Sequence, residues 1–324
     1  MNSIFPSRDT TRIHFAHIAY QFDNCFAKRN LDIKFFQSRT AADAAAQIRH
    51  SEVLVATGFW RNELLDQAEN LRFIQVAGAG YDAFDLDALR ARGIRLANSS
   101  GVNKNAVSEH AMGLILSFSR RLHEARDNQQ QRFWRGMMSD FNQREDELPG
   151  KTLLIYGLGA IGDRLAKLAR AFDMHVVGIK RNTDVSTSAH EVYTPDAFTR
   201  WLPQADFVAL TCPLTDATRN LMNAETFALM RPDAYFINVA RGGCVDEASL
   251  EAALANHQIK GAGIDTTVTE PLAAESNLWA LPNAIITPHT GGETCLYEEN
   301  VIDFLVENLN RLWAGQTELV NQVI

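Results

Sequence analysis

A glycine-rich turn between two apolar strands most constrains what this chain can fold into. Residues 153–156 form a continuous apolar run, as expected of a parallel strand that is buried on both faces. Gly157, Gly159 and Gly162 follow as G-x-G-x-x-G, and a stretch with helical spacing then leads to a second strand at 175–179. This order of strand, tight turn, helix and strand predicts a unit that binds the pyrophosphate of a dinucleotide at a helix N-terminus.

The residues of the turn have separate expected tasks. Gly157 allows the tight turn, Gly159 lets a phosphate approach the backbone, and Gly162 lets the helix and the strand pack closely. Ala160 and Ile161 complete the expected cofactor-binding turn. A glycine-tolerant turn without a ligand is the alternative, but the two flanking strands favour dinucleotide binding.

Size and composition are those of an ordinary globular protein with two domains. The chain has 324 residues, of which 46% are hydrophobic and 22% charged, so two cores can form. A net charge of −8 without any Lys/Arg-rich run argues against nucleic acid or an anionic membrane as a partner. The first residues, MNSIFPSRDT, lack the apolar core of a signal peptide, which makes the cytoplasm the expected compartment.

Neither a metal site nor a disulfide framework is expected. The four cysteines are scattered without a C-x-x-C pair and lie at Cys25, Cys212, Cys244 and Cys295. His14 and His17 form H-x-x-H, but they flank a predicted strand and have no other ligand types nearby.

Residues 1–100 alternate apolar strands with helical stretches. The expected strands are 12–16, 33–37, 53–57, 73–76 and 94–97, and the expected helices are 20–28, 41–49, 62–68 and 85–92. This alternation predicts a parallel sheet. Because this part of the chain has no G-x-G-x-x-G, we expect it to form a separate flavodoxin-like domain.

Two segments of this first domain are candidates for substrate contacts. The loop VAGAGY follows a strand, and the backbone amides at Ala79 and Gly80 could face a carboxylate, although a plain turn is an equal alternative. Phe59 and Trp60 follow another strand and could accommodate an apolar side chain of a ligand, unless both pack in the core of the domain.

The remainder of the chain predicts a second α/β domain. Its expected strands after the glycine turn are 207–210, 235–239, 262–264 and 284–287, and its expected helices include 105–121, 224–230 and 247–256. Asp246 is the expected N-cap of the last of these. A polar helical arm at 122–134 fits a subunit contact or a surface crossover, and a final helix at 294–313 is long enough to return to the first domain.

The predicted fold is therefore α/β, with two Rossmann/flavodoxin-like parallel-sheet domains. We expect residues 1–100 and 293–324 to form the substrate-binding domain. Residues 101–292 are expected to form the dinucleotide-binding domain.

Polar residues follow three strands of this second domain. Arg241 comes after 235–239, Asp265 and Glu270 come after 262–264, and His289 comes after 284–287. Ligands of open parallel sheets bind beyond the carboxyl ends of the strands, so these side chains are expected at one edge. Each has an ordinary alternative, such as a surface ion pair, but their joint position favours a site.

The quoted residues resemble the D-isomer-specific 2-hydroxyacid dehydrogenases. The resemblance covers most of the chain and is carried by GLGAIG, LPQADFVALTCPLTDATRNLMN, MRPDAYFINVARGG, GAGIDTTVTEPL and TPHTGG. It implies that Arg241 binds the substrate carboxylate and carbonyl, that His289 is the acid/base, and that Glu270 pairs with His289. It also implies that Asp265 holds the nicotinamide carboxamide and that the amides at Ala79 and Gly80 bind the substrate carboxylate.

The expected cofactor site extends over several neighbouring strand ends. It also includes Thr211, Cys212, Pro213, Val239, Ala240, Arg241, His289 and Gly291. The chemistry fits these residue types, because a carboxylate beside a histidine stabilises the protonated imidazole that must supply a proton to the reduced carbonyl.

The residues after the second strand favour NADP over NAD. NAD-binding members of the family carry an acid there for the ribose 2′-hydroxyl, whereas this chain has Lys180 and Arg181, with Thr183 as a further polar donor. Positive charge suits a 2′-phosphate. Solvated loop charges are the alternative, for which Asp184 is a small argument.

The expected function is NADPH-dependent reduction of a small 2-keto acid to a D-2-hydroxy acid. A dinucleotide-sensing interaction protein of the corepressor type and a phosphoglycerate dehydrogenase are the alternatives. The chain shows no disordered or basic region for partner recruitment, which argues against the first alternative. We expect no room in it for the regulatory domain that many enzymes of the second kind carry. The resemblance also implies an active-site cleft between the two domains and a homodimer that pairs through the coenzyme domain.

Overall fold

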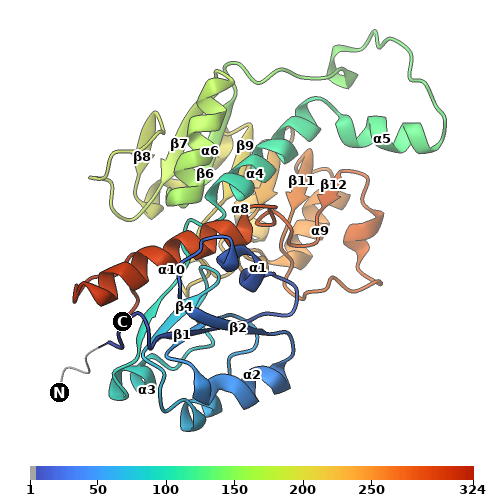
Figure 1. Ribbon diagram of the computed structural model, residues 1–324. Helices are drawn as coiled ribbons and strands as arrows, with labels where there is room; N and C mark the ends of the chain where they lie inside the picture. Colours follow the sequence, from blue (N-terminus) through green and yellow to red (C-terminus); the bar gives the residue numbers. More distant parts are fainter. Residues whose placement is uncertain (1–4) are drawn as a thin grey trace. The chain divides into compact units, whose positions relative to one another are not determined.

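The computed structural model describes residues 5–324, which form two compact units (Figure 1). Unit 1 contains the described residues up to Asn103 together with Thr294–Ile324, and unit 2 contains Lys104–Glu293. Each unit has its own sheet in which all paired strands are parallel. The predicted class of two parallel-sheet α/β domains is therefore confirmed.

Unit 1 has the strand order of a flavodoxin-like fold. Its strands are β1 (Arg12–Ala16), β2 (Lys34–Ser38), β3 (Val53–Ala56), β4 (Phe73–Val76) and β5 (Arg95–Ala97), arranged as β2-β1-β3-β4-β5. Every residue of β3 and β4 is buried, because helices cover both faces of the sheet. The helices are α1 (Phe22–Ala27), α2 (Ala41–Gln47), α3 (Leu86–Ala91) and α10 (Tyr297–Trp313).

Helix α10 is fixed to the sheet of unit 1 by buried polar contacts. The Tyr297 hydroxyl donates to the Ala77 carbonyl at 2.7 Å, and Asn308 Nδ2 donates to Gln75 Oε1 at 2.9 Å. Asn308 Oδ1 in turn accepts from the backbone amide of Val320 at 2.7 Å. These bonds hold α10 beside β4, the strand that leads into the VAGAGY loop, and they tie the last segment of the chain to α10.

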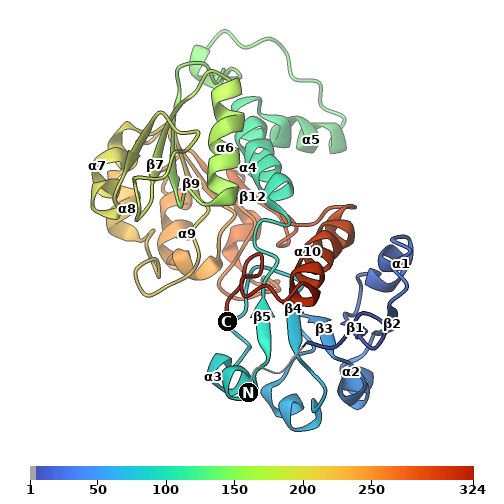
Figure 2. The same cartoon turned by 60° about the vertical axis from the view of Figure 1, so that its left-hand side comes forward.

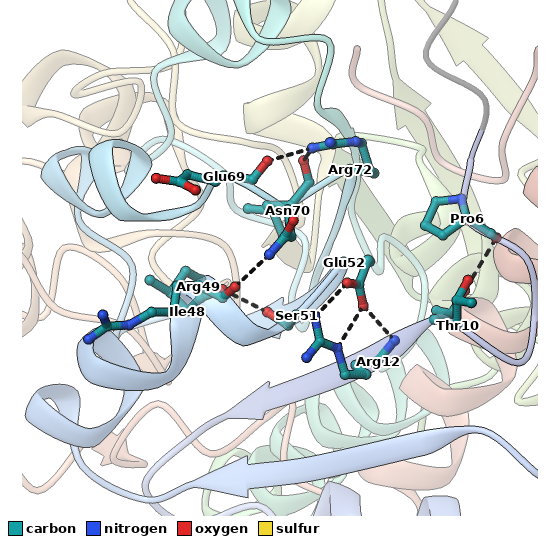
Figure 3. A network of polar contacts seen from close by, with 12 residues as sticks. Pro6, Thr10, Arg12, Ile48, Arg49, Ser51, Glu52, Glu69, Asn70 and Arg72 are labelled. Carbon is teal, nitrogen blue, oxygen red and sulfur yellow. Dashed lines mark hydrogen bonds and ion pairs between the residues drawn. The ribbon is translucent and has the colours of Figure 1, made fainter.

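An ionic contact closes the opposite, amino-terminal end of this sheet (Figure 3). The Glu52 carboxylate accepts from the Arg12 backbone amide at 2.8 Å and from the Arg12 guanidinium at 2.9 Å, while the Glu52 carbonyl accepts from the Arg72 amide at 2.8 Å. The hydrogen bond to Glu52 raises the pKa of Arg12 above its ordinary value. The entrances of β1, β3 and β4 are thus tied together, away from the loops at their carboxyl ends.

Unit 2 has a seven-stranded parallel sheet whose strand order reverses beside the glycine turn. Its strands are β6 (Thr152–Tyr156), β7 (His175–Ile179), β8 (Glu191–Tyr193), β9 (Phe207–Leu210), β10 (Tyr235–Asn238), β11 (Gly261–Ile264) and β12 (Ala284–Ile286), arranged as β12-β11-β10-β9-β6-β7-β8. The strand order reverses between β6 and β9. Such a switch point is where open parallel sheets bind ligands.

Helices cover both faces of the second sheet. Helices α4 (Lys104–Ser119) and α6 (Ala160–Ala171) lie side by side on one face (Figure 2). Helices α7 (Phe198–Trp201), α8 (Ala224–Leu229) and α9 (Glu247–Ala255) pack on the other face, and α5 (Leu122–Gln130) has no buried residue. None of the helices in residues 5–324 is both long and apolar enough to cross a bilayer.

Short 3-10 turns connect several of these elements. They are Ile48–His50, Asn62–Gln67, Phe141–Gln143, Pro195–Ala197, Leu202–Gln204, Gly242–Cys244 and Asn277–Ala280. The helix expected at 62–68 is therefore a 3-10 turn, and the polar helical arm ends at Gln130 rather than at 134. The final helix begins at Tyr297 rather than at 294.

Two further expectations need correction. Strand β8 was not expected, because its three half-buried residues are too few for an apolar pattern. Asp246 does occupy the N-cap position of α9, but its side chain caps no backbone amide, since it accepts from the Ser249 hydroxyl.

Trp60 is a core residue and not a substrate contact. It is 1% exposed, its ring stacks on Phe84 with centroids 5.1 Å apart, and its indole N–H donates to Asn62 Oδ1 at 2.9 Å. Phe59 is half-buried against the same core. The alternative of core packing therefore holds for Trp60, because the strand end turns this side chain inward.

Candidate functional site

The glycine turn leaves no room for side chains at two of its positions. Gly157 has a φ of +107°, and a Cβ there would lie 2.7 Å from the backbone nitrogen of Cys212. A Cβ on Gly162 would lie 2.3 Å from the Gly157 carbonyl oxygen, which accepts a hydrogen bond from the Thr211 hydroxyl at 2.7 Å. The ends of β6 and β9 and the start of α6 are therefore in direct backbone contact.

Gly159 differs from these two glycines because its surroundings are open. It is the N-cap of α6, has no side-chain cap, and no heavy atom lies within 4 Å of the position of a Cβ. Ala160 and Ile161 begin the twelve-residue helix, whose first amides and dipole suit an anion. The turn thus combines a rigid base with an open face.

The segment after β7 places positive charge beyond the same edge of the sheet. The Lys180 amide donates to the Tyr193 carbonyl at 2.9 Å, and Arg181 and Thr183 are exposed. Burial is the main cause of a raised pKa of Tyr156, the last residue of β6, and the charge of Arg181 opposes that rise. The positive charge of Arg181 is therefore felt at the end of β6. Within residues 5–324, no carboxylate lies at ion-pair distance from Lys180 or Arg181.

The cysteine that follows β9 is part of the rigid base. The Cys212 thiol contacts the Cys244 thiol, and this hydrogen bond together with burial raises the pKa of Cys212. The next carbonyl, that of Pro213, accepts from the Thr218 hydroxyl at 2.7 Å. The expected contacts of Cys212 and Pro213 with the cofactor stay a prediction.

Arg241 follows β10 and the buried residues Val239 and Ala240. Its side chain is exposed, and Nη1 donates to the Ala240 carbonyl at 2.7 Å. A Cβ on the next residue, Gly242, would lie 2.0 Å from the carbonyl carbon of Thr267, so this turn packs directly on the segment that leads to Glu270.

His289 and Glu270 are in contact. His289 Nδ1 lies 2.7 Å from Glu270 Oε2, while Glu270 Oε1 accepts from the Thr267 amide at 3.1 Å. The carboxylate is therefore held at both oxygens, and it fixes the orientation of the imidazole. Both side chains are partly exposed, and Nε2 of His289 makes no hydrogen bond within the described chain.

Asp265 organises the turn that carries His289. The carboxylate is 4% exposed, and Oδ1 accepts from the Thr290 amide at 3.0 Å and the Gly291 amide at 3.1 Å. The Asp265 carbonyl accepts from the His289 amide at 2.9 Å. His289 has a φ of +55°, a left-handed conformation that is costly for a residue with a side chain and persists where neighbours determine it.

Two residues of this cluster were missed by sequence analysis. The Thr287 hydroxyl lies 2.6 Å from Asp265 Oδ1, and His110 Nε2 lies 2.9 Å from the same hydroxyl and 3.6 Å from Asp265 Oδ1. Thr287 is the first residue of the TPHTGG motif, but no role was assigned to it. His110 lies on α4, before the glycine turn in the chain, and no sequence spacing links it to His289.

Ala79 and Gly80 lie in unit 1, in the exposed loop after β4. The Ala79 carbonyl accepts from Asn98 Nδ2 at 2.8 Å, which anchors the loop. Their expected contact with a substrate carboxylate stays a prediction. In the described part of the chain, no three His, Cys, Asp or Glu side chains converge as metal ligands would.

Known proteins resemble this chain in sequence. The family model described as "D-isomer specific 2-hydroxyacid dehydrogenase, NAD binding domain" matches residues 112–291. Glyoxylate/hydroxypyruvate reductase B of Escherichia fergusonii is 36% identical over 257 residues, which are 79% of each chain. D-3-phosphoglycerate dehydrogenase of Mycobacterium leprae is 32% identical over 254 residues, 78% of this chain and 47% of the relative. The chain thus spans about half the length of the phosphoglycerate dehydrogenase it matches.

Solved structures agree with the sequence comparison. A D-isomer specific 2-hydroxyacid dehydrogenase family protein from Aeromonas salmonicida matches with a TM-score of 0.83 and 29% identity, over 97% of this chain and 99% of that one. The fold and the glycine turn thus define a Rossmann-type, NAD-binding class of protein. Within that class, this chain belongs to the D-isomer specific 2-hydroxyacid dehydrogenase family.

Alanine at two glycines separates the rigid base of the turn from its open face. Gly162→Ala should lower the melting temperature of the free protein by several degrees, because its Cβ meets backbone at 2.3 Å. Gly159→Ala should leave the melting temperature within about 1 °C, because nothing lies within 4 Å. Equal melting temperatures for the two variants, measured by calorimetry without ligand, would contradict this description of the turn.

Proposed function

We propose that this protein reduces a small 2-keto acid to the D-2-hydroxy acid, with NADPH as the hydride donor. The observation that carries the proposal is the contact of His289 Nδ1 with Glu270 at 2.7 Å, on an edge of the sheet that also holds the glycine turn. Because Glu270 occupies Nδ1, Nε2 is the nitrogen that faces a reactant. The carboxylate fixes the orientation of the ring, as proton transfer to a positioned substrate requires.

The residues of unit 2 divide the work of the reaction. Bound NADPH supplies the hydride for the carbonyl carbon of the keto acid. Negative charge then builds on the carbonyl oxygen, and His289 Nε2 gives that oxygen a proton. Arg241 presents a planar, permanently charged fork that suits the substrate carboxylate and orients the carbonyl.

The turn fits the coenzyme it is proposed to hold. Gly159 has an open Cβ position at the uncapped N-terminus of α6, which is the cradle that a pyrophosphate requires. We assign the pyrophosphate to residues 157–162 and the nicotinamide carboxamide to Asp265, whose Oδ2 accepts a hydrogen bond from the Gly291 amide at 3.0 Å. Oδ2 retains capacity for a second donor.

Substitution of the acid–base pair tests this function. NADPH oxidation is followed at 340 nm with a panel of 2-keto acids. His289→Gln should reduce kcat/KM by about a hundredfold or more, since it removes the proton donor, while NADPH binding by fluorescence is retained. Glu270→Gln should lower kcat by about tenfold, because the imidazole then loses the carboxylate that fixes its orientation.

Two exposed residues provide matched controls for these substitutions. His257→Gln and Glu275→Gln make the same chemical changes outside the site and should leave the rates within twofold. Near-wild-type reduction by His289→Gln or by Glu270→Gln would refute the assigned roles.

The panel of keto acids also tests two alternative functions. The 32% identity to a phosphoglycerate dehydrogenase favours inclusion of 3-phosphohydroxypyruvate, the phosphorylated three-carbon keto acid. A preference for it over unphosphorylated keto acids would identify that activity. Binding of NADPH without turnover of any keto acid would instead identify a dinucleotide sensor.

The preference for NADPH rests on the segment after β7. Lys180 and Arg181 have no carboxylate partner in the described chain, and the positive charge of Arg181 opposes the rise in the pKa of Tyr156 at the end of β6. The Asn182 side chain accepts from the Asp184 amide at 2.9 Å, which makes the segment a turn of fixed form. An acid for a ribose 2′-hydroxyl is absent at the strand end, and cations suit a 2′-phosphate.

Coenzyme kinetics test this preference. We expect kcat/KM for NADPH to exceed that for NADH, and Lys180→Asp or Arg181→Ala to reduce the ratio at least about tenfold. Lys167→Ala removes an exposed charge elsewhere in unit 2 and should leave the ratio unchanged. Added salt should weaken the preference, because the contact is ionic and partly exposed. A wild type that prefers NADH would overturn this assignment.

We also propose a homodimer that forms through the arm after α4. Trp134 is 94% exposed, and Phe133, Met137 and Phe141 are exposed with it. Together with α5, Phe133 and Trp134 line a groove of about 490 Å³. So many exposed large apolar side chains on one arm are typical of a subunit interface.

Light scattering at micromolar concentration tests the dimer. The wild type should have twice the chain mass of 36.1 kDa. Trp134→Ser with Met137→Ser should shift the protein towards monomer without loss of fold, since both side chains are exposed. Trp279→Ser removes an exposed tryptophan elsewhere and should leave the mass unchanged. A wild type that is entirely monomeric would contradict the proposal.

A further inference from the structure

We propose that His110 is a positioning residue for His289, acting through the Thr287 hydroxyl and the Asp265 carboxylate. This inference rests on the proposed function, because it assumes that the orientation of His289 matters for proton transfer. It concerns a side chain on α4, which is distant in the chain from the turn that it supports.

The donors and acceptors of the cluster fix the direction of each hydrogen bond. A carboxylate only accepts, so the single proton of the Thr287 hydroxyl points to Asp265 Oδ1 at 2.6 Å. The hydroxyl oxygen then accepts from His110, whose Nε2 lies 2.9 Å away. Nε2 of His110 must therefore carry a proton.

Asp265 passes this constraint to the catalytic turn. Oδ1 accepts from Thr287 and from the amides of Thr290 and Gly291, so donors on both sides of His289 meet on one atom. His289 itself is left-handed at φ +55° and donates its amide to the Asp265 carbonyl at 2.9 Å. The side chain of Asp265 thereby fixes the strained His289 through hydrogen bonds to residues on both sides of it in the chain.

The cluster packs closely against Gly291. A Cβ on Gly291 would lie 2.6 Å from Asp265 Oδ2 and 3.2 Å from Cδ2 of His110. His110 and Asp265 thus both pack against Gly291. Loss of the His110 donor would free the Thr287 hydroxyl to rotate, which weakens its bond to Asp265 and loosens the turn.

The inference predicts different kcat values for two substitutions of His110 that are similar in size. His110→Gln retains an N–H donor and should keep kcat for keto acid reduction within about threefold, whereas His110→Leu should lower kcat about tenfold by misplacing His289. KM for NADPH should change less than kcat in both, because the glycine turn is untouched. Thr287→Val should match His110→Leu, and the double variant should be no worse than either single one.

His175→Leu serves as the control for loss of a histidine hydrogen bond. His175 Nε2 lies 3.0 Å from Glu191 at the amino-terminal end of β7, so its removal should leave kcat within twofold. Melting temperatures of all variants establish that each is folded. Equal kcat values for His110→Gln and His110→Leu, or additive losses in the double variant, would overturn the inference.

Nitrogen NMR of histidine-labelled protein tests the same geometry without activity. The His110 resonance, assigned by its absence in His110→Gln, should carry its proton on Nε2. A neutral ring protonated on Nδ1 alone would overturn the inference even if every keto acid is reduced. A wild type that reduces no keto acid but has the Nε2 proton would instead overturn the proposed function.

Discussion

The buried carboxylate of Asp265 is the interaction on which the candidate site depends. It takes hydrogen bonds from Thr287, Thr290 and Gly291, and the Asp265 carbonyl takes one from His289. A buried charge is costly unless it is fully paired, so this aspartate can occupy its position only if the turn folds around it. The same bonds hold His289 in the left-handed conformation from which it reaches Glu270.

Rigid backbone contacts are equally important at the glycine turn, which follows β6. Gly157 packs against Cys212 and Gly162 packs against Gly157, with no space for a side chain at either, and β6 and β9 meet there at the switch of strand order. Gly159 is left open at the start of α6. A fixed base with one open face can receive a pyrophosphate without any rearrangement of the chain.

Sequence and structure agree where a strong local signal exists. Apolar runs identified β6 and β7, and the glycine spacing predicted the contacts of Gly157 and Gly162, because only backbone geometry is involved. Trp60 was ambiguous, since an aromatic side chain after a strand can turn inward or outward. His110 could not be found, because its partner Thr287 lies on another strand end and a hydrogen bond across the fold leaves no pattern in the chain.

The most direct test of the central claim is isotope transfer from the coenzyme. NADPH deuterated at C4 of the nicotinamide is incubated with the best 2-keto acid of the panel, and the product is resolved by chiral chromatography and mass spectrometry. The account predicts a D-2-hydroxy acid with one deuterium at C2 when the transferred face of the coenzyme carries the label. An L-product, or a product that is unlabelled with deuterium on either face, would contradict it.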